Sequence, residues 1–282
     1  IDCTFDVGGS LKERIDEIRN ECETAVREGS TNLILSDKDI NRKRASIPSV
    51  LFVGAVHSHL VKHGLRGYCS LNVECSDVLD THSFAVLIGI GATTINPYLA
   101  IDSIHNRFVK KLFEKSDFED CVVRFKKSID AGLLKIMSKM GISVISSYRG
   151  GCNFEAVGLS RAIVSDYFPG MSSRISGIGI NGIEEKIKNL HTKNSEQNVL
   201  SLPIGGLYRY RKTGENHQNQ GNLIHLLQSA VGSGSYEQYK KYSEGIHGLP
   251  PINLRDLLQF KRKKDPISIN EVETEDLILK RF

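Results

Sequence analysis

The sequence predicts an α/β protein built on a parallel sheet. Short β-branched segments alternate with amphipathic helical segments about five times in the first half of the chain, which is typical of parallel strands joined by crossover helices. The length of 282 residues, with 40% hydrophobic and 25% charged residues, suits one large globular domain or two small ones. The sheet is either doubly wound or part of a (β/α) barrel, and about five units are too few to close a barrel.

The expected helices of the first half begin at capping residues. Ser10 and Glu13 form a capping box, in which each side chain accepts a hydrogen bond from the other residue's backbone amide. Gly29 suits the left-handed position that follows a helix end. Pro48 is preorganised for a first helical turn, and Asn96 is expected to cap the helix after it. The expected helices span residues 11–26, 48–63, 81–88, 97–113 and 118–140.

The expected strands are short, apolar and β-branched. They span residues 1–5, 32–36, 69–75, 93–95 and 142–147. Segment 37–46, DKDINRKRAS, is polar and is expected to be an exposed loop.

The longest patterned stretch runs from residue 116 to residue 168. Ser116 and Glu119 form a second capping box, and apolar residues then recur every three or four positions. Gly141 ends that helix, a buried strand follows at 142–147, and residues 148–151 turn into another helix. Because the turn after a strand emerges at the carboxyl edge of a parallel sheet, we expect this turn where ligands and partner domains dock.

Basic side chains accompany this turn. Lys135 and Lys139 lie one helical turn apart, and the negative helix end offsets their repulsion. With Arg149 they could bind an anion or an acidic partner loop; two exposed lysines are the alternative. Arg149 offers a planar fork for a carboxylate or for backbone carbonyls, and Gly150 permits close backbone approach. A local pair between Arg149 and Glu155 is the competing explanation.

After residue 168 the sequence becomes glycine-rich and polar. Further elements are expected as a helix to about residue 191, an edge strand or hairpin at 207–211, and helices at 222–231, 235–244, 252–260 and 268–282. We divide the chain into a partial barrel-like β/α core (1–175), a mainly helical extension with a glycine-rich connector (176–250), and a linker and helix (251–282).

Charge and cysteine content narrow the classes of function. The net charge is +4, and the 37 basic and 33 acidic residues are interspersed, which argues against nucleic-acid binding. No apolar run approaches the ~18–20 residues of a membrane span. The N-terminus has neither an initiator Met nor a signal peptide, so we expect a fragment of a longer protein. The six cysteines form no C-x-x-C pair and are expected to be buried free thiols of a reducing compartment.

A glycine motif and a basic run are each interpreted as structural features rather than binding sites. Gly177, Gly179 and Gly182 spell G-x-G-x-x-G, but the preceding MSSRIS is a poor strand, so a glycine-rich connector is favoured over a dinucleotide site. The basic run at 261–264 is expected to be a solvated helix end in a linker.

Three histidines lie on one expected helix. His57 and His59 diverge around the helix axis, whereas His59 and His63 could share a face. Two ligands without a third acid do not make a metal site, so surface or helix-packing histidines are expected.

One long run resembles a known family. Residues 132–168, GLLKIMSKMGISVISSYRGGCNFEAVGLSRAIVSDYF, resemble the central domain of the glutamate synthase large subunit. The segments NLILSDKDI, RASIPSVLFVGAVHSHLVKHGLR, INPYLAID, SSRISGIGI, SGSYEQYKKYS and EVETEDLILKRF agree in the same order, so the resemblance covers essentially the whole chain. Two positions depart from the family pattern: Gly151 replaces an alanine or similar residue, and Thr81-His82 replaces a frequent His-His pair.

The resemblance implies a fold and an activity. The fold would be an incomplete, degenerate TIM-barrel-like domain. The full enzyme would release ammonia from glutamine in an amidotransferase domain and pass it through an internal tunnel to an FMN-binding barrel that also holds an iron–sulfur cluster. There, ammonia and 2-oxoglutarate would form glutamate with a hydride from reduced FMN. The central domain would connect these domains and help form the tunnel; a purely structural spacer is the alternative, and a self-sufficient FMN enzyme a weaker one.

The resemblance also limits what this chain is expected to hold. We expect no catalytic, cofactor-binding or metal-binding residue and no cofactor in this chain, so that it is inactive alone. The interdomain or tunnel candidates are Lys135, Lys139, Tyr148, Arg149 and Gly150. The expected partners are the other domains of the same polypeptide, without nucleic acid or membrane, in the cytoplasm or in a plastid. The electron donor could be NADPH, NADH or ferredoxin.

Overall fold

The computed structural model describes residues 1–113, 116–195, 205–206, 209–211 and 214–282. The chain divides into two compact units, Ile1–Asn198 and Val199–Phe282. The first unit is an α/β fold with parallel sheets, as the sequence predicts.

A three-stranded parallel sheet forms the centre of the first unit. Its strands β2 (Asn32–Ser36), β4 (Ser70–Glu74) and β5 (Thr94–Asn96) lie in the order β2-β4-β5, which confirms three expected strands. Helices α2 (Ser49–Lys62) and α3 (Thr81–Gly89) connect them, as expected. Strands that follow one another along the chain are therefore neighbours, without a reversal of strand order.

The N-terminal segment extends this sheet. The amides of Cys3 and Ser36 donate to the carbonyls of Ser36 and Ile1, so residues 1–3 run parallel to β2. The chain then turns into β1 (Thr4–Asp6), which pairs antiparallel with β3 (Arg44–Ser46). The expectation of an exposed loop over 37–46 is thus wrong at its end, because the pairing with β1 buries Ala45 to 1% exposure.

Helix α1 (Leu11–Arg27) agrees most closely with its expectation. The Ser10 hydroxyl accepts from the Glu13 amide, and five apolar side chains spaced by three or four residues are buried: Leu11, Ile15, Ile18, Cys22 and Val26. Helix α4 (Tyr98–Val109) is shorter than expected, and Asn96 is not its cap because it ends β5.

The long helix is present, but the strand expected after it is wrong. Helix α5 (Phe118–Lys139) is capped by Asp117, whose carboxylate accepts from the Asp120 amide, and not by Ser116. Residues 142–147 instead lead into a short helix, α6 (Ile145–Tyr148). The apolar side chains of this segment lack a neighbouring strand; Ile145 is 46% exposed, and the buried anchor is Tyr148 at 1%.

A second parallel pair follows where a helix was expected. Strands β6 (Glu155–Leu159) and β7 (Ser172–Ile178) are joined by α7 (Arg161–Tyr167), and α8 (Ile180–Ser195) follows β7. The dismissal of residues 171–176 as a poor strand is wrong. Most residues of β7 are exposed, so pairing with β6 rather than a buried apolar face defines this strand, and the hydrophobic pattern could not reveal it.

The helices enclose one main hydrophobic core over the sheet. α1 packs against both α2 and α8, and α2 packs against α3 and α7. Four of the six cysteines are buried in this core, and all six are free thiols, as expected: Cys3, Cys22, Cys69, Cys75, Cys121 and Cys152. Burial raises the pKa of the Cys22 thiol to about 12, so it stays protonated at neutral pH.

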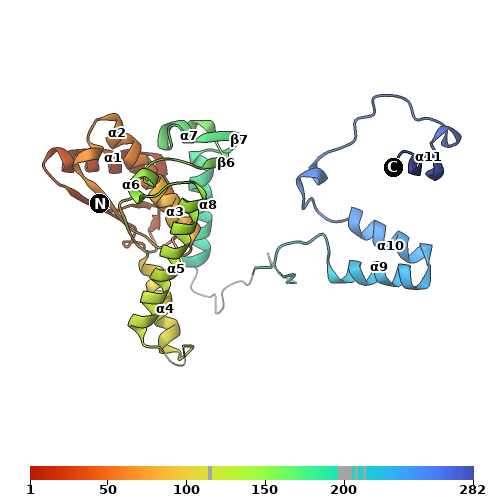
Figure 1. The fold of residues 1–282 in the computed structure, drawn as a ribbon, viewed down its shortest axis with the longest axis horizontal. Helices are drawn as coiled ribbons and strands as arrows, with labels where there is room; N and C mark the ends of the chain where they lie inside the picture. The colour runs from red at the N-terminus through yellow and green to blue at the C-terminus, as the bar shows by residue number, and fades with distance from the viewer. Residues whose placement is uncertain (114–115, 196–204, 207–208, 212–213) are drawn as a thin grey trace. The chain divides into compact units, whose positions relative to one another are not determined.

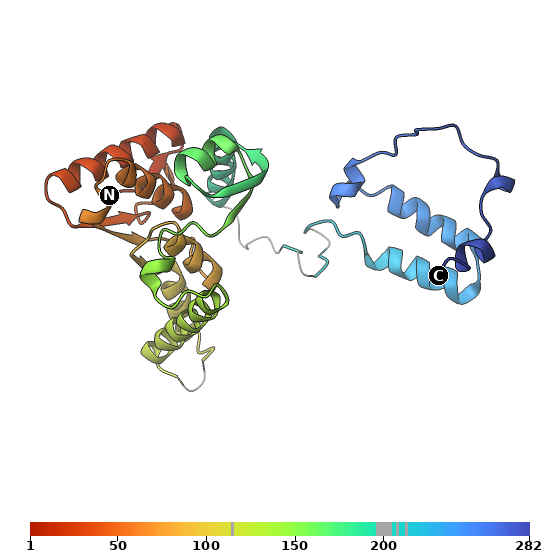
Figure 2. The same cartoon turned by 45° about the horizontal axis from the view of Figure 1, so that its top comes forward.

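The second unit contains a helical hairpin. Helices α9 (Gly221–Ser233) and α10 (Tyr236–His247) pack side by side, and Gly234 takes the left-handed turn between them with φ 64°. Both helices confirm the expectation (Figures 1 and 2). The segment expected as an edge strand lies partly outside the described residues, and residues 209–211 form no strand.

Beyond the hairpin the chain contains only short elements. These are η2 (Leu254–Leu257), η3 (Ile269–Glu271) and α11 (Glu275–Leu279), so the longer helices expected at 252–260 and 268–282 are wrong. No residue from 252 to 282 is buried, and only two are partly covered. An amphipathic segment without a surface to cover gains little from helix formation.

Candidate functional site

Polar side chains gather at the carboxyl ends of the three parallel strands. Ser36 ends β2, Glu74 ends β4 and Asn96 ends β5, and the register of the sheet places these ends side by side. In open α/β sheets this edge is where ligands bind. We call the set the carboxyl-edge cluster; it consists of Ser36, Asp37, Lys38, Glu74, Ser76, Asn96 and Tyr98.

Glu74 is the charged centre of the carboxyl-edge cluster. Its Oε1 lies 2.6 Å from Lys38 Nζ and accepts from Asn96 Nδ2 at 3.2 Å, while its Oε2 accepts from the Ser36 hydroxyl at 2.7 Å. The bond to Lys38, followed by the bond to Ser36, lowers the pKa of Glu74. Glu74 is therefore a carboxylate that joins three strand ends.

Asp37 is the buried member of the cluster. It is 0% exposed, and its Oδ2 accepts from the Ser46 hydroxyl at 2.9 Å and from the Ser76 hydroxyl at 2.6 Å and amide at 3.1 Å. Its Oδ1 accepts no direct hydrogen bond of good geometry from the described residues. Burial, followed by a hydrogen bond to Asp37 and the charge of that carboxylate, raises the pKa of Tyr98, so the phenol stays protonated.

A largely apolar hollow of about 370 Å³ adjoins this edge. It lies between β5, α4 and α5, and its lining includes Ile95, Asn96, Phe125 and Ile129. Asn96 thus belongs both to the hollow and to the carboxyl-edge cluster. Together they offer hydrogen-bond acceptors beside apolar walls, a combination that can hold a small polar molecule.

The turn at residues 148–151 lies at the opposite edge of the sheet. Gly150 donates its amide hydrogen to the Ile88 carbonyl at 3.1 Å, and Cys152 donates to the Gly89 carbonyl at 2.9 Å. These carbonyls end α3, directly before the amino end of β5. The expectation that this turn lies at the carboxyl edge is therefore wrong, because the strand on which it rested does not form.

The turn is held from inside by Tyr148. Its hydroxyl donates to the Ala85 carbonyl at 3.1 Å, and its ring meets Phe154 edge to face. Arg149, by contrast, is exposed, and Glu155 lies 3.7 Å from Arg174 rather than pairing with Arg149. Lys135 and Lys139 are also exposed, one turn apart on α5. The structure thus leaves these three cations accessible, whereas Tyr148 supports the turn.

His57 is a packing residue behind this turn. Arg66 Nε donates to His57 Nδ1 at 3.1 Å, and burial followed by the charge of Arg66 lowers the pKa of His57 to about 4. The imidazole is therefore neutral at physiological pH. Two glycines face it closely: a Cβ on Gly91 would lie 2.2 Å from His57 Nδ1, and one on Gly150 would lie 3.3 Å from Cε1. The interpretation of His57 as a packing histidine is confirmed.

The G-x-G-x-x-G run does lie between a strand and a helix. Gly177 is in β7, Gly179 is in the turn and Gly182 is in the first turn of α8. Close packing explains two of them, because a Cβ on Gly177 would lie 2.3 Å from the Gly158 carbonyl oxygen and one on Gly182 would lie 2.6 Å from Ile178 Cγ1. That the run binds no dinucleotide stays a prediction.

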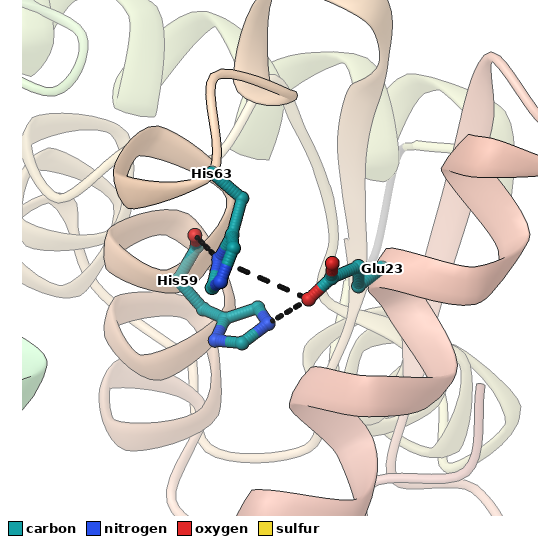
Figure 3. Close-up of side chains that lie close together, drawn as sticks. All are labelled: Glu23, His59 and His63. Atoms are coloured by element: carbon teal, nitrogen blue, oxygen red, sulfur yellow. Dashed lines mark hydrogen bonds and ion pairs between the residues drawn. The ribbon is translucent and has the colours of Figure 1, made fainter.

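Sequence reasoning found two members of a further cluster and missed the third. His59 and His63 share a helix face as expected, and a third ligand, Glu23 of α1, lies beside them (Figure 3). Glu23 is 36 positions from His59 in the chain, so local spacing could not join them. The packing of α1 against α2 is the signal that would have found it.

Comparison with known proteins identifies the family. Residues 1–160 match the family model described as glutamate synthase central domain. The chain is 52% identical over its whole length to the glutamate synthase [NADPH] large chain of Azospirillum brasilense, and spans 19% of that protein. It is 38% identical to the ferredoxin-dependent glutamate synthase of Pyropia yezoensis over 97% of this chain, and 37% identical to the glutamate synthase [NADPH] large chain of Bacillus subtilis (strain 168) over 96%; it spans 18% of each. Within the described part of the chain, no helix is long and apolar enough to cross a membrane.

Proposed function

Because this chain belongs to the glutamate synthase central domain family, we propose that it connects the amidotransferase and FMN-binding domains of a glutamate synthase large chain. In this proposal the full enzyme makes glutamate from glutamine and 2-oxoglutarate, and the connecting segment helps form the passage for ammonia. The chain spans about a fifth of the length of the relatives it matches, so it would be one part of that enzyme and inactive alone.

One observation carries the proposal. The similarity extends over 96–100% of this chain both for relatives named for NADPH and for one named for ferredoxin. A segment shared by enzymes with different electron donors serves a step that they have in common. Transfer of ammonia between domains is such a step, whereas contact with the electron donor is not.

A degenerate TIM-barrel-like origin of the fold is part of this proposal. Strands that follow one another along the chain lie side by side, as in a (β/α) barrel and unlike the reversed order of a doubly wound sheet. Helix α8 packs against α1, so the last β/α unit approaches the first. The three segments 1–175, 176–250 and 251–282 remain our proposed division into core, helical extension and connection to the FMN domain.

The implied cofactors are proposed to lie in the other domains. An iron–sulfur cluster needs several cysteine thiolates together, and no group of three cysteines comes together among the residues that the structure describes. The residues present therefore do not fit such a cluster. FMN is likewise assigned to the following domain, and the compartment is proposed to be the cytoplasm or a plastid.

We propose two places where this segment faces the ammonia passage or a neighbouring domain. We keep Lys135, Lys139, Tyr148, Arg149 and Gly150 as the proposed interdomain residues. Arg149 and both lysines are exposed and would make the contacts, and the buried Tyr148 with Gly150 would hold the turn that presents Arg149. The carboxyl-edge cluster is the second place. The Asp37 carboxylate can accept several hydrogen bonds, and the neighbouring hydroxyls can both accept and donate, so together they suit a small amine.

The test separates this role from that of a spacer. Arg149→Ala and Asp37→Asn would each be placed in the full enzyme, with Lys12→Ala on exposed α1 as the control. Glutamate formation would be measured with glutamine and, separately, with added ammonia. A role at the passage is supported if the rate of glutamate formation falls about tenfold or more with glutamine but not with added ammonia. A tenfold fall corresponds to about 1.4 kcal/mol in activation free energy. Equal rates for all three variants and wild type with both nitrogen sources would leave only the spacer.

A further inference from the structure

Helices α1 and α2 bring three metal-ligating side chains together on the surface of the first unit. One nitrogen each of His59 and His63 and one oxygen of Glu23 lie within 4.8 Å of one another (Figure 3). Among the residues that the structure describes, no other set of three histidines, cysteines or carboxylates meets this condition.

The two histidines are placed by the helix itself. His59 and His63 are four residues apart on α2, so both project from one face, and their ring centroids are 4.3 Å apart. His63 Nδ1 also lies 2.8 Å from the His59 carbonyl oxygen. The same nitrogen faces Glu23 Oε2, so metal binding through Nδ1 would replace its bond to the carbonyl.

The carboxylate is held from its other side. Glu23 Oε1 accepts from Arg27 Nε at 2.8 Å and lies 2.7 Å from Arg27 Nη2, whereas Oε2 faces the histidines. Oε2 is 2.6 Å from His59 Nε2 and 3.8 Å from His63 Nδ1. Arg27 thus holds one carboxylate oxygen, and the other oxygen is directed at both imidazoles.

We propose that Glu23, His59 and His63 form a site for a divalent transition-metal ion of the Zn²⁺ class that joins α1 to α2. Two imidazoles and one carboxylate suit zinc, whose ligands are nitrogen, sulfur and oxygen, whereas Ca²⁺ and Mg²⁺ take oxygen ligands. Zinc bonds of ~2.0–2.2 Å separate two tetrahedral ligand atoms by about 3.3–3.6 Å. The 2.6 Å contact of Glu23 with His59 would thus widen as the metal replaces the shared proton, which leaves to solvent.

The surroundings leave the fourth coordination position of the ion to water. The side chains are 21%, 17% and 35% exposed for Glu23, His59 and His63, so solvent reaches the site and water can complete the coordination. Arg27 opposes the ion by its positive charge but is 55% exposed and screened. A hydrogen-bonded Glu23–His59 contact that only holds the helices together is the competing explanation.

Metal titration of the 282-residue chain after chelator treatment decides between the metal site and the hydrogen-bonded contact. Zn²⁺ would be followed by calorimetry, and Co²⁺ by its visible absorption, which is strong when cobalt is four-coordinate. His63→Asn removes one ligand but spares the Glu23–His59 bond, and Glu23→Gln removes the charge but can retain a hydrogen bond. His247→Asn is the matched control. His247 Nδ1 makes the same bond to a carbonyl four residues earlier, at 2.7 Å, but among the described residues His247 belongs to no group of three metal-ligating side chains.

We expect both test variants to bind one equivalent of Zn²⁺ fewer than wild type, and His247→Asn to bind as wild type does. Excess Zn²⁺ should raise the unfolding temperature of wild type by more than that of His63→Asn, since a ligand that binds only the folded state stabilises it. Absence of Zn²⁺ uptake by wild type, or the same stoichiometry in wild type and His63→Asn, would overturn the proposal. If Glu23→Gln fails to fold, His63→Asn alone decides between the two explanations.

Discussion

The two edges of the central sheet are constructed in opposite ways. The carboxyl edge carries a charged Glu74, a buried Asp37 and hydroxyls that can exchange hydrogen-bond partners. The amino edge is closed by a neutral His57, a buried Tyr148 and glycines that leave no space for a side chain. One edge therefore has unused hydrogen-bonding capacity, whereas the other is fixed by close contact.

The two edges therefore suit different roles: the carboxyl edge can bind a partner, and the amino edge supports the fold. A polar edge can accept a new partner without movement of the backbone, whereas a closely packed edge transmits any change to the elements on it. Arg149 is thus presented by a rigid turn, although it lies at the edge where barrel enzymes do not place their chemistry. Stability and pH measurements on the isolated chain, which we predict to fold without activity, can test whether the two edges differ in this way. The expected effects decrease from the amino edge to the carboxyl edge.

The largest effect is expected for Gly91→Ala at the amino edge. Gly91 has φ +123°, and an added Cβ would lie 2.2 Å from His57 Nδ1 and 2.5 Å from Cγ. Backbone strain and overpacking add, so we expect a loss of roughly 3–5 kcal/mol in the free energy of unfolding by urea.

Gly29→Ala is the matched control. Gly29 has φ +100° but no atom within 4 Å of an added Cβ, so it carries the backbone strain without the clash. We expect a loss of about 1 kcal/mol. Equal losses in the two variants would show that the amino edge yields more easily than the structure indicates.

The next effect is a pH dependence due to His57. Its pKa is lowered from 6.5 to about 4 in the folded chain, so the unfolded chain binds the proton first as pH falls. Stability from this group is complete above pH 6.5 and is lost between pH 6.5 and about 4, by roughly 3 kcal/mol in total. His57→Gln should remove that slope, measured by urea unfolding from pH 7 to pH 4. An unchanged slope in the variant would assign the dependence to other groups.

Local signals explain why much of the fold was predictable. Helix α1 and strands β2 and β4 have regular apolar patterns and clear end signals, and their buried residues follow from spacing alone. β7 and the strand expected at 142–147 show the limit. The polar segment β7 forms a strand because β6 lies beside it. The β-branched segment 142–147 forms no strand, because no strand lies beside it.

Prediction of the candidate sites was limited in the same way: local patterns identified single residues but not their neighbours in space. Arg149 and the two lysines were found as charged residues near a helix end, and the structure leaves them exposed. Their edge of the sheet was mispredicted because it was inferred from the missing strand. Glu74 falls within the strand expected at 69–75, and Asp37 falls at the start of the loop expected at 37–46. Their joint role depends on the register of β2 with β4, which no local pattern encodes.

A smaller effect is expected for Tyr148→Phe. This change removes only the hydroxyl that donates to the Ala85 carbonyl at 3.1 Å, and the ring still fills its place against Phe154. Loss of one buried hydrogen bond should lower the free energy of unfolding by about 1–2 kcal/mol. Tyr167→Phe is the comparison, because the Tyr167 hydroxyl makes no hydrogen bond to the described residues that this change would remove. Similar losses in both would mean that the Tyr148 hydroxyl does not anchor the turn.

The smallest effect is expected at the carboxyl edge, for Glu74→Gln. The ion pair with Lys38 has one partner 50% exposed, so its loss should lower the free energy of unfolding by only about 0.5–1 kcal/mol at pH 7. The pKa of Glu74 is lowered below 4.5 in the folded chain, so its contribution is present above pH 4.5 and is lost as pH falls through the lower, folded value. Wild type and variant should therefore converge in acid below pH 4.5, whereas the His57 dependence acts mainly above it. A difference that persists unchanged in acid would mean that Glu74 acts through packing, and the electrostatic contrast between the two edges would be lost.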